Sequence, residues 1–365
     1  MNDRAVSVFE NYDVKILGTA KGRGALLAET EQGWLILKEY TGPEARLELQ
    51  EKLLQAVRDA GFPGVEQLLR NKEGELLTRD QDRTAYIVKT WFDGRECNLR
   101  DVKECQNAAR TLGRLHLAME QPQLAAQYTG RPFSLEREYA RHNRELKKVR
   151  RYLREKGQKS DFERFLLHHY DRFYEKALET EEQLKTETAD REAAVCAALA
   201  GGPEAHRASA AWNMPEAQSA SAAKGVPEAH RRAADTGGCF CHGDFQHHNL
   251  LCCRDGFAVI NFEKYLVDNP VRDLYLFLRK LLEKNGWSSS IALSILTAYE
   301  TQRTLSDQDR RQLYYRFAYP EKFWKIVNFY YNSGKAWIPG RNREKLENLL
   351  RQETEKKLFL DSVLK

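Results

Sequence analysis

The stretch "HGDFQHHNLL", residues 242–251, constrains the fold of this chain more than any other. Its Asp and its Asn stand five positions apart, as in the loop H-R-D-x-x-x-x-N that serves phosphoryl transfer. In that loop the Asp accepts a proton from the acceptor, and the Asn holds a metal ion. The spacing therefore predicts Asp244 as a catalytic residue and Asn249 as a metal ligand.

A strand-like run, "FAVINFEKY", follows at residues 257–265. A site for phosphoryl transfer needs a carboxylate in this run, because magnesium prefers charged oxygen ligands. The chain has Asn261 there, which offers a neutral carbonyl oxygen. Glu263 lies two residues on and, if the segment is extended, projects to the same face and substitutes in part. Asn261 and Glu263 are thus candidate metal ligands in a site weakened for Mg²⁺.

The segment "LILKEY" places Lys38 on a predicted strand after a glycine-containing hairpin. A phosphate-binding Lys occupies this position in kinases, and the alternative is an ordinary exposed lysine on a strand. Gly22 and Gly24 in the hairpin are candidate nucleotide contacts. The hairpin does not match the pattern G-x-G-x-x-G, so its glycines are a weak signal.

A kinase lysine also needs an acidic partner on a neighbouring helix. Apolar residues at helical spacing predict a helix over residues 43–60, and its inward face carries Gln50. Gln50 is therefore the candidate cofactor-binding residue on this helix, and it lacks the negative charge of the usual acidic residue. Lys38 is expected to lack its usual partner, and either to have no fixed partner or to pair with Glu48 or Glu51.

The order of elements predicts an α+β, bilobal protein-kinase-like fold. The first ninety residues read as strands broken by glycine plus the helix at 43–60, which favours a small β-rich lobe over residues 1–92. The remainder, 93–365, reads as a larger helical lobe. Its predicted helices cover residues 102–119, 134–190 (two helices broken at "KGQKSD"), 271–284, 289–302, 306–318, 320–333 and 342–361. Asp273 is expected to cap or brace the helix after the motif.

A repeat interrupts the helical part. "PEAHR" occurs at 203–207 and again at 227–231, with "PEAQS" at 215–219 between them. Such short Ala- and Pro-rich units have no hydrophobic face and cannot bury a core. Residues 198–237 are therefore predicted to be a disordered insertion, and a binding tract is the less favoured alternative.

Bulk properties exclude several classes of protein. A net charge of +5 over 365 residues is too small a bias for a nucleic-acid footprint. The sequence has no apolar run of the roughly 18 residues that a membrane span needs. The start, "MNDRAVSVFENYDVK", has no apolar signal core, so the sequence predicts a cytoplasmic protein.

Four of the seven Cys lie beside the motif, at Cys239, Cys241, Cys252 and Cys253. A zinc site is one interpretation, but the spacings C-x-C and C-C differ from the C-x₂₋₄-C pairs typical of zinc ligands. The favoured interpretation is small buried residues on the strands around the loop.

Several segments together resemble the CotS family of spore coat proteins. They are "HGDFQHHNLL", "INFEKY", "DLYLFLRK" and above all "YPEKFWKIVNFYYNSGKAWIPGRNREKLE". The family belongs to the superfamily of aminoglycoside phosphotransferases and choline kinases. The resemblance implies a bilobal kinase-like fold, a site for ATP and Mg²⁺, synthesis in the mother cell, a place in the spore coat, and other coat proteins as partners.

Two functions of different classes remain open. The favoured one is a role in coat structure or assembly with weak or absent phosphotransfer, because Asn261 and Gln50 lack the charges that the reaction needs. The alternative is an active ATP-dependent phosphotransferase that acts on a small molecule or a coat protein. An antibiotic-modifying enzyme has only superfamily support, since fold does not fix function.

Overall fold

The computed structural model describes residues 7–22, 24–130, 133–199, 239–332 and 339–364. The chain forms two compact units. Unit 1 comprises Met1–Pro132, Glu228–Leu281 and Ser294–Thr304, and unit 2 comprises Phe133–Pro227, Leu282–Leu293 and Leu305–Lys365. The lobe boundary expected at residue 92 falls within unit 1 and stays a prediction.

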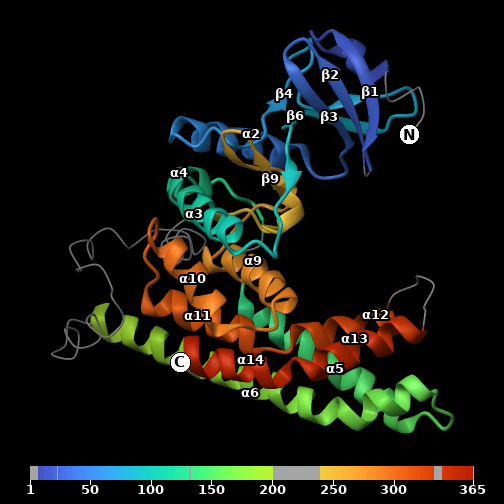
Figure 1. The fold of residues 1–365 in the computed structure, drawn as a ribbon, viewed down its shortest axis with the longest axis vertical. Helices are drawn as coiled ribbons and strands as arrows, with labels where there is room; N and C mark the ends of the chain where they lie inside the picture. The colour runs from blue at the N-terminus through green and yellow to red at the C-terminus, as the bar shows by residue number, and fades with distance from the viewer. Residues whose placement is uncertain (1–6, 23, 131–132, 200–238, 333–338, 365) are drawn as a thin grey trace. The chain divides into compact units, whose positions relative to one another are not determined.

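Unit 1 begins with an antiparallel sheet, drawn in blue to cyan in Figure 1. Its strands follow the order β1-β2-β3-β6-β4, and the short β5 pairs with β6. The bounds are β1 Ile16–Gly22, β2 Ala25–Thr30, β3 Gly33–Glu39, β4 Leu68–Leu69, β5 Thr78–Arg79 and β6 Ala85–Thr90. Gly24 has a φ of +69° between β1 and β2, a conformation that glycine adopts without a steric penalty.

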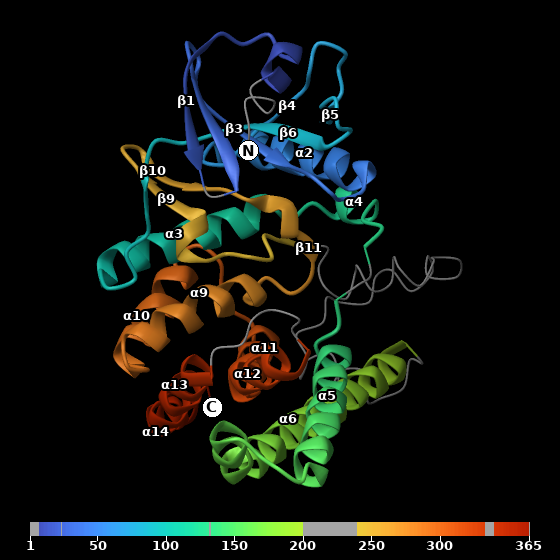
Figure 2. The same ribbon diagram turned by 90° about the vertical axis from the view of Figure 1, so that its right-hand side faces the viewer.

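Helix α2, Glu44–Asp59, lies along this sheet in both ribbon views (Figures 1 and 2). Leu47 and Val57 on its apolar face are fully buried, as the periodicity predicts. Leu47 packs with Ile87 of β6 in one hydrophobic cluster. Pro43 stands at the N-cap, where a missing N–H costs no helical hydrogen bond.

The motif segment adds small strands to unit 1. A three-stranded sheet has the order β10-β9-β7, and a two-stranded one pairs β11 with β8. Helix α3, Val102–Ala118, is capped by the side chain of Asp101. The bounds of the other elements here are α4 Pro122–Ala125, β7 Arg95–Glu96, β8 Phe240–Cys241, β9 Leu250–Cys253, β10 Gly256–Val259 and β11 Leu266–Val267.

Unit 2 is helical and has its own hydrophobic core. Helices α5, Leu135–Glu155, and α6, Asp161–Leu199, are separated at "KGQKSD", as predicted. Phe173 of α6 stacks on Phe323 of α12, with ring centroids 4.6 Å apart. The C-terminal helices are α11 Asp307–Ala318, α12 Glu321–Asn332, α13 Pro339–Arg351 and α14 Glu353–Phe359, followed by a π-helical turn at Leu360–Leu364.

The structure differs from the sequence predictions in two segments. The single helix expected over 342–361 is wrong, because Gln352 separates α13 from α14. The Gln352 side chain accepts a hydrogen bond from Trp287 Nε1 and donates one to the carbonyl of Glu283, contacts that periodicity does not reveal. Of the predicted insertion, residues 198–199 belong to α6, and residues 200–237 lie outside the described part of the chain.

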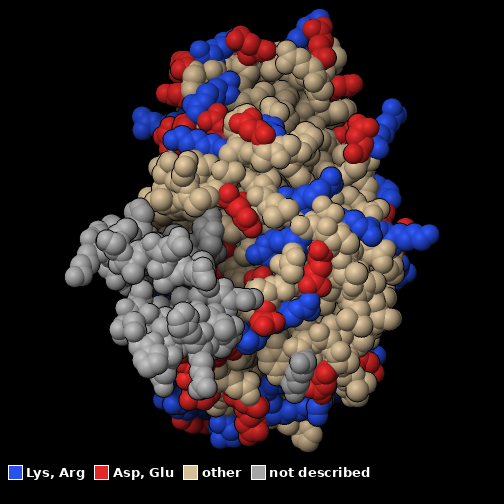
Figure 3. Space-filling model, turned by 90° about the vertical axis from the view of Figure 1, so that its left-hand side faces the viewer, with Lys and Arg blue, Asp and Glu red and all other residues tan. Residues whose placement is uncertain are grey.

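Helices α9, Val271–Lys284, and α10, Ser289–Glu300, match the predicted ranges closely. A sheet-rich N-terminal region and a helical C-terminal region confirm the predicted α+β class. In the described ranges, every helix is too short or too polar to cross a membrane. On the face shown in Figure 3, basic and acidic side chains are interspersed, as on an ordinary solvated surface.

Candidate active site

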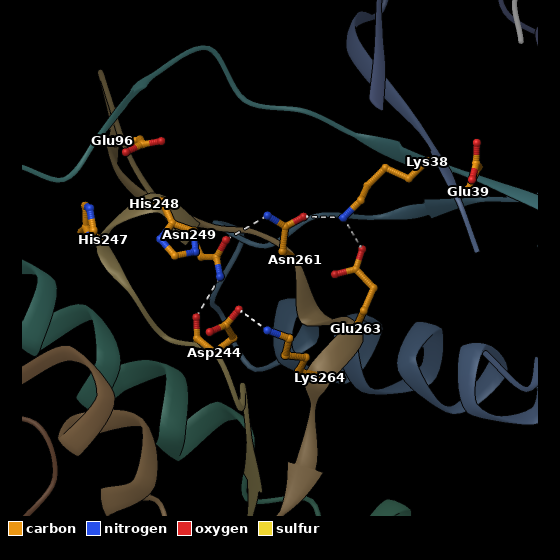
Figure 4. A pocket seen from close by; sticks show the side chains of 10 residues that line it. All are labelled: Lys38, Glu39, Glu96, Asp244, His247, His248, Asn249, Asn261, Glu263 and Lys264. Atoms are coloured by element: carbon orange, nitrogen blue, oxygen red, sulfur yellow. Dashed lines mark hydrogen bonds and ion pairs between the residues drawn. The ribbon is translucent and has the colours of Figure 1, made fainter. Parts of the chain in front are cut away.

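A pocket of about 700 Å³ lies within unit 1. It receives residues from β3, from the motif loop after β8 and from the turn after β10, and Figure 4 shows these side chains together. Its lining comprises Lys38, Glu39, Glu96, Asp244, His247, His248, Asn249, Asn261, Glu263 and Lys264. Five of the residues singled out from the sequence therefore meet in one pocket: Lys38, Asp244, Asn249, Asn261 and Glu263.

Asp273 holds the motif loop in place. Its carboxylate is fully buried and accepts hydrogen bonds from the backbone N–H of His242, at 2.6 Å, and of Gly243, at 2.9 Å. Burial raises the pKa of Asp273. The contact with His116, whose Nε2 lies 3.4 Å away, and the hydrogen bonds from the loop lower this pKa by more, so it lies below its ordinary value. Asp273 thus braces the loop as well as standing in the first turn of α9.

Gly243 is required by the shape of the loop. Its φ is +80°, and a Cβ atom there would lie 2.1 Å from the carbonyl oxygen of Lys264. Both the backbone conformation and the space therefore select glycine in "HGD". The turn that carries Lys264 can approach the loop this closely only because residue 243 has no side chain.

We expect Gly243→Ala to destabilise the protein by about 2–4 kcal/mol, because left-handed strain and a backbone overlap add together. Gly61→Ala is the matched control, since Gly61 has a φ of +84° and nothing within 4 Å of its Cβ position. The control should be destabilised by the backbone strain alone, about 1–2 kcal/mol. Denaturant unfolding of both variants measures the difference, and equal losses would contradict the close approach of the turn.

Asp244, the predicted catalytic residue, is paired with a lysine. Its Oδ2 lies 2.8 Å from Nζ of Lys264, and its Oδ1 accepts a hydrogen bond from Gln246. Partial burial raises the pKa of Asp244, but the hydrogen bonds from Lys264 and Gln246 outweigh it and hold the pKa below its ordinary value. This pairing favours the charged form of the carboxylate and makes it a weaker base.

The two predicted amide ligands bind one another. Asn261 Nδ2 donates to Asn249 Oδ1 at 2.9 Å, and Asn261 Oδ1 accepts from Lys38 Nζ at 3.0 Å. Asn249 in turn donates to the carbonyl of Asp244 at 2.8 Å. Figure 4 shows this chain of contacts across the pocket. Both amide oxygens thus already serve as acceptors for N–H groups.

Glu263 accepts from two ammonium groups. Its Oε1 lies 3.0 Å from Nζ of Lys38 and 2.7 Å from Nζ of Lys89. Although burial raises the pKa of Glu263, the two lysines lower it to about 2. In the pairing of β3 with β6, Lys38 lies opposite Ile87, and Ile36 lies opposite Lys89. Lys38 and Ile36 are two positions apart on β3, so both lysines project from the same face of the sheet.

The expected partners of Lys38 are corrected by this geometry. Glu48 and Glu51 both bind Arg70, so neither is its counter-ion. Lys38 pairs with Glu263 because the turn after β10 brings that carboxylate to the sheet. The extended geometry considered for this segment is also wrong, since Phe262–Lys264 form a 3₁₀ turn after Asn261, whose φ is 67°.

Three charged residues that build the site were missed from the sequence, and two of them form a buried ion pair behind the pocket lining. Lys89 Nζ lies 2.9 Å from Glu66 Oε2, and both side chains have no exposed surface. Glu66 also accepts the backbone N–H groups of Asn261 and Phe262, at 2.8 and 3.0 Å. A lysine inside the apolar run "TAYIVKTW" is a signal for such a buried pair, but the run does not identify the partner.

Lys264 is the third missed residue. It follows Glu263 directly in "INFEKY", so it lies next to a residue that was already a candidate. An extended segment would send adjacent side chains to opposite faces, which hides their joint role. In the 3₁₀ turn both residues reach the pocket instead.

The remaining predicted contacts lie elsewhere in unit 1. Gln50 is buried in α2, and its Nε2 has no hydrogen-bond partner among the described residues. Gly22 ends β1 and Gly24 occupies the following turn. The described lining of the pocket includes none of these three, and their role in binding a cofactor stays a prediction.

The four clustered cysteines lie in or beside the strands around the motif. Cys241 ends β8, and Cys252 and Cys253 end β9, while Cys239 precedes β8. Cys239 and Cys241 are buried, and the other two are partly exposed. The described residues contain no group of three or more His, Cys, Asp or Glu side chains arranged to hold a metal ion.

A magnesium ion does not fit the donors in this pocket. Magnesium takes six oxygen ligands and is held by one or two carboxylates. Here the amide oxygens of Asn249 and Asn261 accept N–H groups, and Glu263 accepts two ammonium groups at one oxygen. A divalent ion bound by Asn261 and Glu263 would lie close to the ammonium group of Lys38, which already donates to an oxygen of each.

Comparisons with known proteins agree with the predicted resemblance. Residues 227–363 match the family described as "Spore coat putative kinase YutH". Spore coat protein S of Bacillus subtilis (strain 168) is 27% identical over 135 residues, which are 36% of this chain and 38% of that protein. The match thus spans well under half of that relative. The similarity to CotS-type spore coat proteins is confirmed.

Solved structures confirm the kinase-like fold. An aminoglycoside phosphotransferase from Alicyclobacillus acidocaldarius has a TM-score of 0.72 at 18% identity, over 98% of this chain and 94% of that one. The AMP-bound spectinomycin phosphotransferase APH(9)-Ia has a TM-score of 0.59 at 11% identity, over 99% and 98%. The amicoumacin kinase hAmiN, in complex with AMP-PNP and Ca²⁺, has 0.53 at 12%, over 100% and 95%. At these identities the likeness shows the fold alone.

Proposed function

We propose that this kinase-fold relative of the CotS spore coat proteins acts in the structure or assembly of a spore coat, with little or no phosphotransfer. In this proposal the chain is made in the cytoplasm of the mother cell, joins other coat proteins and binds an adenine nucleotide. The coat role is supported by the similarity over residues 227–363. Nucleotide binding is supported by the shared fold, since two similar structures carry AMP or AMP-PNP.

The main support for weak or absent phosphotransfer is the ion pair of Lys264 with Asp244, at 2.8 Å. A base in phosphoryl transfer must face the hydroxyl of the acceptor and take its proton. Here an ammonium group occupies one oxygen of the carboxylate, and the amide of Gln246 occupies the other. The paired carboxylate would have to break its contact with Lys264 or Gln246 before it could accept a proton from an acceptor hydroxyl.

The second contribution comes from Asn261, which stands where a metal-binding carboxylate is needed. Asn tolerates the left-handed backbone of this position, as Asp does, so Asn261→Asp changes the charge and keeps the turn. This makes the substitution a clean test. Magnesium at a neutral amide lacks the charge that would anchor it across phosphates.

We expect wild-type protein to hydrolyse or transfer ATP at the background rate, and Asn261→Asp to gain at most about tenfold, because Lys264 still occupies Asp244. The double variant Asn261→Asp/Lys264→Ala should gain more than either single variant. Asp244→Ala is the inactive control. Release of phosphate and transfer to coat protein are measured together, with Mg²⁺ present.

The same variants test the coat role. Asp244→Ala should enter the spore coat as the wild type does, because assembly in this proposal needs the fold and not the reaction. Robust turnover by the wild type that disappears in Asp244→Ala, together with failure of that variant to enter the coat, would favour the active phosphotransferase instead.

A further inference from the structure

The pocket has an unusual charge arrangement. Three lysine ammonium groups, from Lys38, Lys89 and Lys264, face the carboxylates of Glu66, Glu263 and Asp244. Each carboxylate of this set is thus paired with an ammonium group without any bound ion, and Glu39 and Glu96 add further negative charge to the pocket lining. A divalent cation is held best by carboxylate oxygens that are not already paired with ammonium groups.

From this arrangement, and resting on the proposed nucleotide binding, we propose that the pocket binds the phosphate chain of a nucleotide without a divalent cation. The ammonium group of Lys264 takes the bridging place between the carboxylate of Asp244 and the phosphates. The chemical class of the ligand is a polyphosphate, here carried by a nucleoside.

The two lysines that line the pocket differ from the buried one. The side chain of Lys264 is 68% exposed, that of Lys38 is 27% exposed, and Lys89 is fully buried. Lys89 is held by Glu66 and Glu263 and anchors the turn. Lys38 and Lys264 have surface free to face an incoming anion, and both line the pocket.

An ammonium group can bridge where a metal would. It carries three N–H donors, so Lys264 can keep one on Asp244 and direct others to phosphate oxygens. Hydrogen bonds between an ammonium and a phosphate are charge-assisted and strong. Lys38 acts in the same way from the sheet, since its bonds to Asn261 and Glu263 leave one of its three N–H donors for a phosphate oxygen.

A divalent cation would meet opposition in the same space. Its nearest oxygen ligands, on Asn261 and Glu263, lie about 3 Å from the ammonium of Lys38. Two positive groups at such separations repel, and the repulsion grows as water is excluded. Chelation of the phosphates by magnesium would also remove negative charge that the lysines attract. Binding in the presence of Mg²⁺ should therefore be no stronger than binding without it.

The proposal is tested by calorimetric titration of the full chain with ATP, in EDTA and in MgCl₂. We expect binding in EDTA with an affinity equal to or higher than that in MgCl₂. Lys264→Met should weaken binding in EDTA about tenfold, the loss of one charge-assisted hydrogen bond. Lys264→Arg keeps the charge and should retain most of the affinity.

Lys15→Met is the matched control, because Lys15 is an exposed lysine in unit 1 that pairs with Glu31 away from the pocket lining. It should leave the affinity unchanged. Titration with inorganic tripolyphosphate separates the two parts of the ligand. Binding of tripolyphosphate that also depends on Lys264 assigns the effect to the phosphate chain, as proposed.

Three outcomes would overturn the proposal: binding only when Mg²⁺ is present, an affinity in EDTA that Lys264→Met leaves unaltered, or no binding of either ligand. The last outcome leaves a coat role without turnover intact, because that part of the proposed function needs no nucleotide. Robust ATP turnover by the wild type would instead overturn the proposed function, so the two failures are distinguishable.

Discussion

Replacing Glu66 by glutamine is expected to lower the free energy of unfolding by about 3–5 kcal/mol, the cost of breaking a buried ion pair from one side. Lys89 has no exposed surface, so its charge must be met by carboxylates within the protein. Glu66→Gln removes the closest charge apart from Glu263 and turns an N–H donor toward an ammonium or a backbone N–H. Either arrangement leaves a buried polar group opposed or unsatisfied.

The same substitution acts on the turn that carries the site. The Glu66 carboxylate accepts the backbone N–H groups of Asn261 and Phe262, which fixes the left-handed residue at the start of the turn. A glutamine can accept only one of these bonds well, since its second terminal atom is a donor. The turn should therefore loosen, and Glu263 and Lys264 with it.

Denaturant unfolding of Glu66→Gln and of the wild type measures the effect. Lys15→Ala is the control, because it removes one member of an exposed ion pair and should cost less than about 1 kcal/mol. A loss for Glu66→Gln as small as that of the control would show that the Lys89 charge finds another partner. The assignment of Glu66 as the anchor of the turn would then be wrong.

The fold could be predicted well where local pattern determines structure. The apolar face of α2 and the break between α5 and α6 follow from spacing and from turn residues. The separation of α13 from α14 could not be predicted, because it depends on a side chain that bonds to Trp287, 65 positions away in sequence. Such contacts exist only after the chain has folded.

The site shows the same division. The spacing within "HGDFQHHN" places Asp244 and Asn249 correctly in one pocket. The pairing of charges could not be predicted, since it depends on the 3₁₀ turn at Phe262–Lys264, which reorients the residues after Asn261. A motif fixes which residues are near one another, but the rotation of a turn decides which charge neutralises which. For this reason Lys264 was missed although it adjoins a residue that was found.

The second large effect is expected for Asp273→Asn, which should also destabilise the protein by about 3–5 kcal/mol. The buried carboxylate accepts the N–H groups of His242 and Gly243, one at each oxygen. An asparagine can accept at one oxygen only, and its amide nitrogen would oppose the other N–H. The contact with His116 would also lose its charge.

The pH dependence of Asp273→Asn gives an independent reading. The folded-state pKa of Asp273 lies below its ordinary value of 3.8, so its carboxylate contributes stability that is complete above about pH 4. This contribution is lost as the pH falls through the lower, folded-state pKa. Asparagine does not titrate, so the stability of the variant should fall less steeply with acid in that range.

Two measurements decide the outcome for Asp273. Asp309→Asn is the matched control, since Asp309 is a buried carboxylate in the capping box of α11, where a cap is worth about 1 kcal/mol. Amide hydrogen exchange at His242 and Gly243 should accelerate in Asp273→Asn and not in the control. Because Asp273 holds the loop by its backbone, unchanged exchange at these two amides would mean that other contacts position the loop.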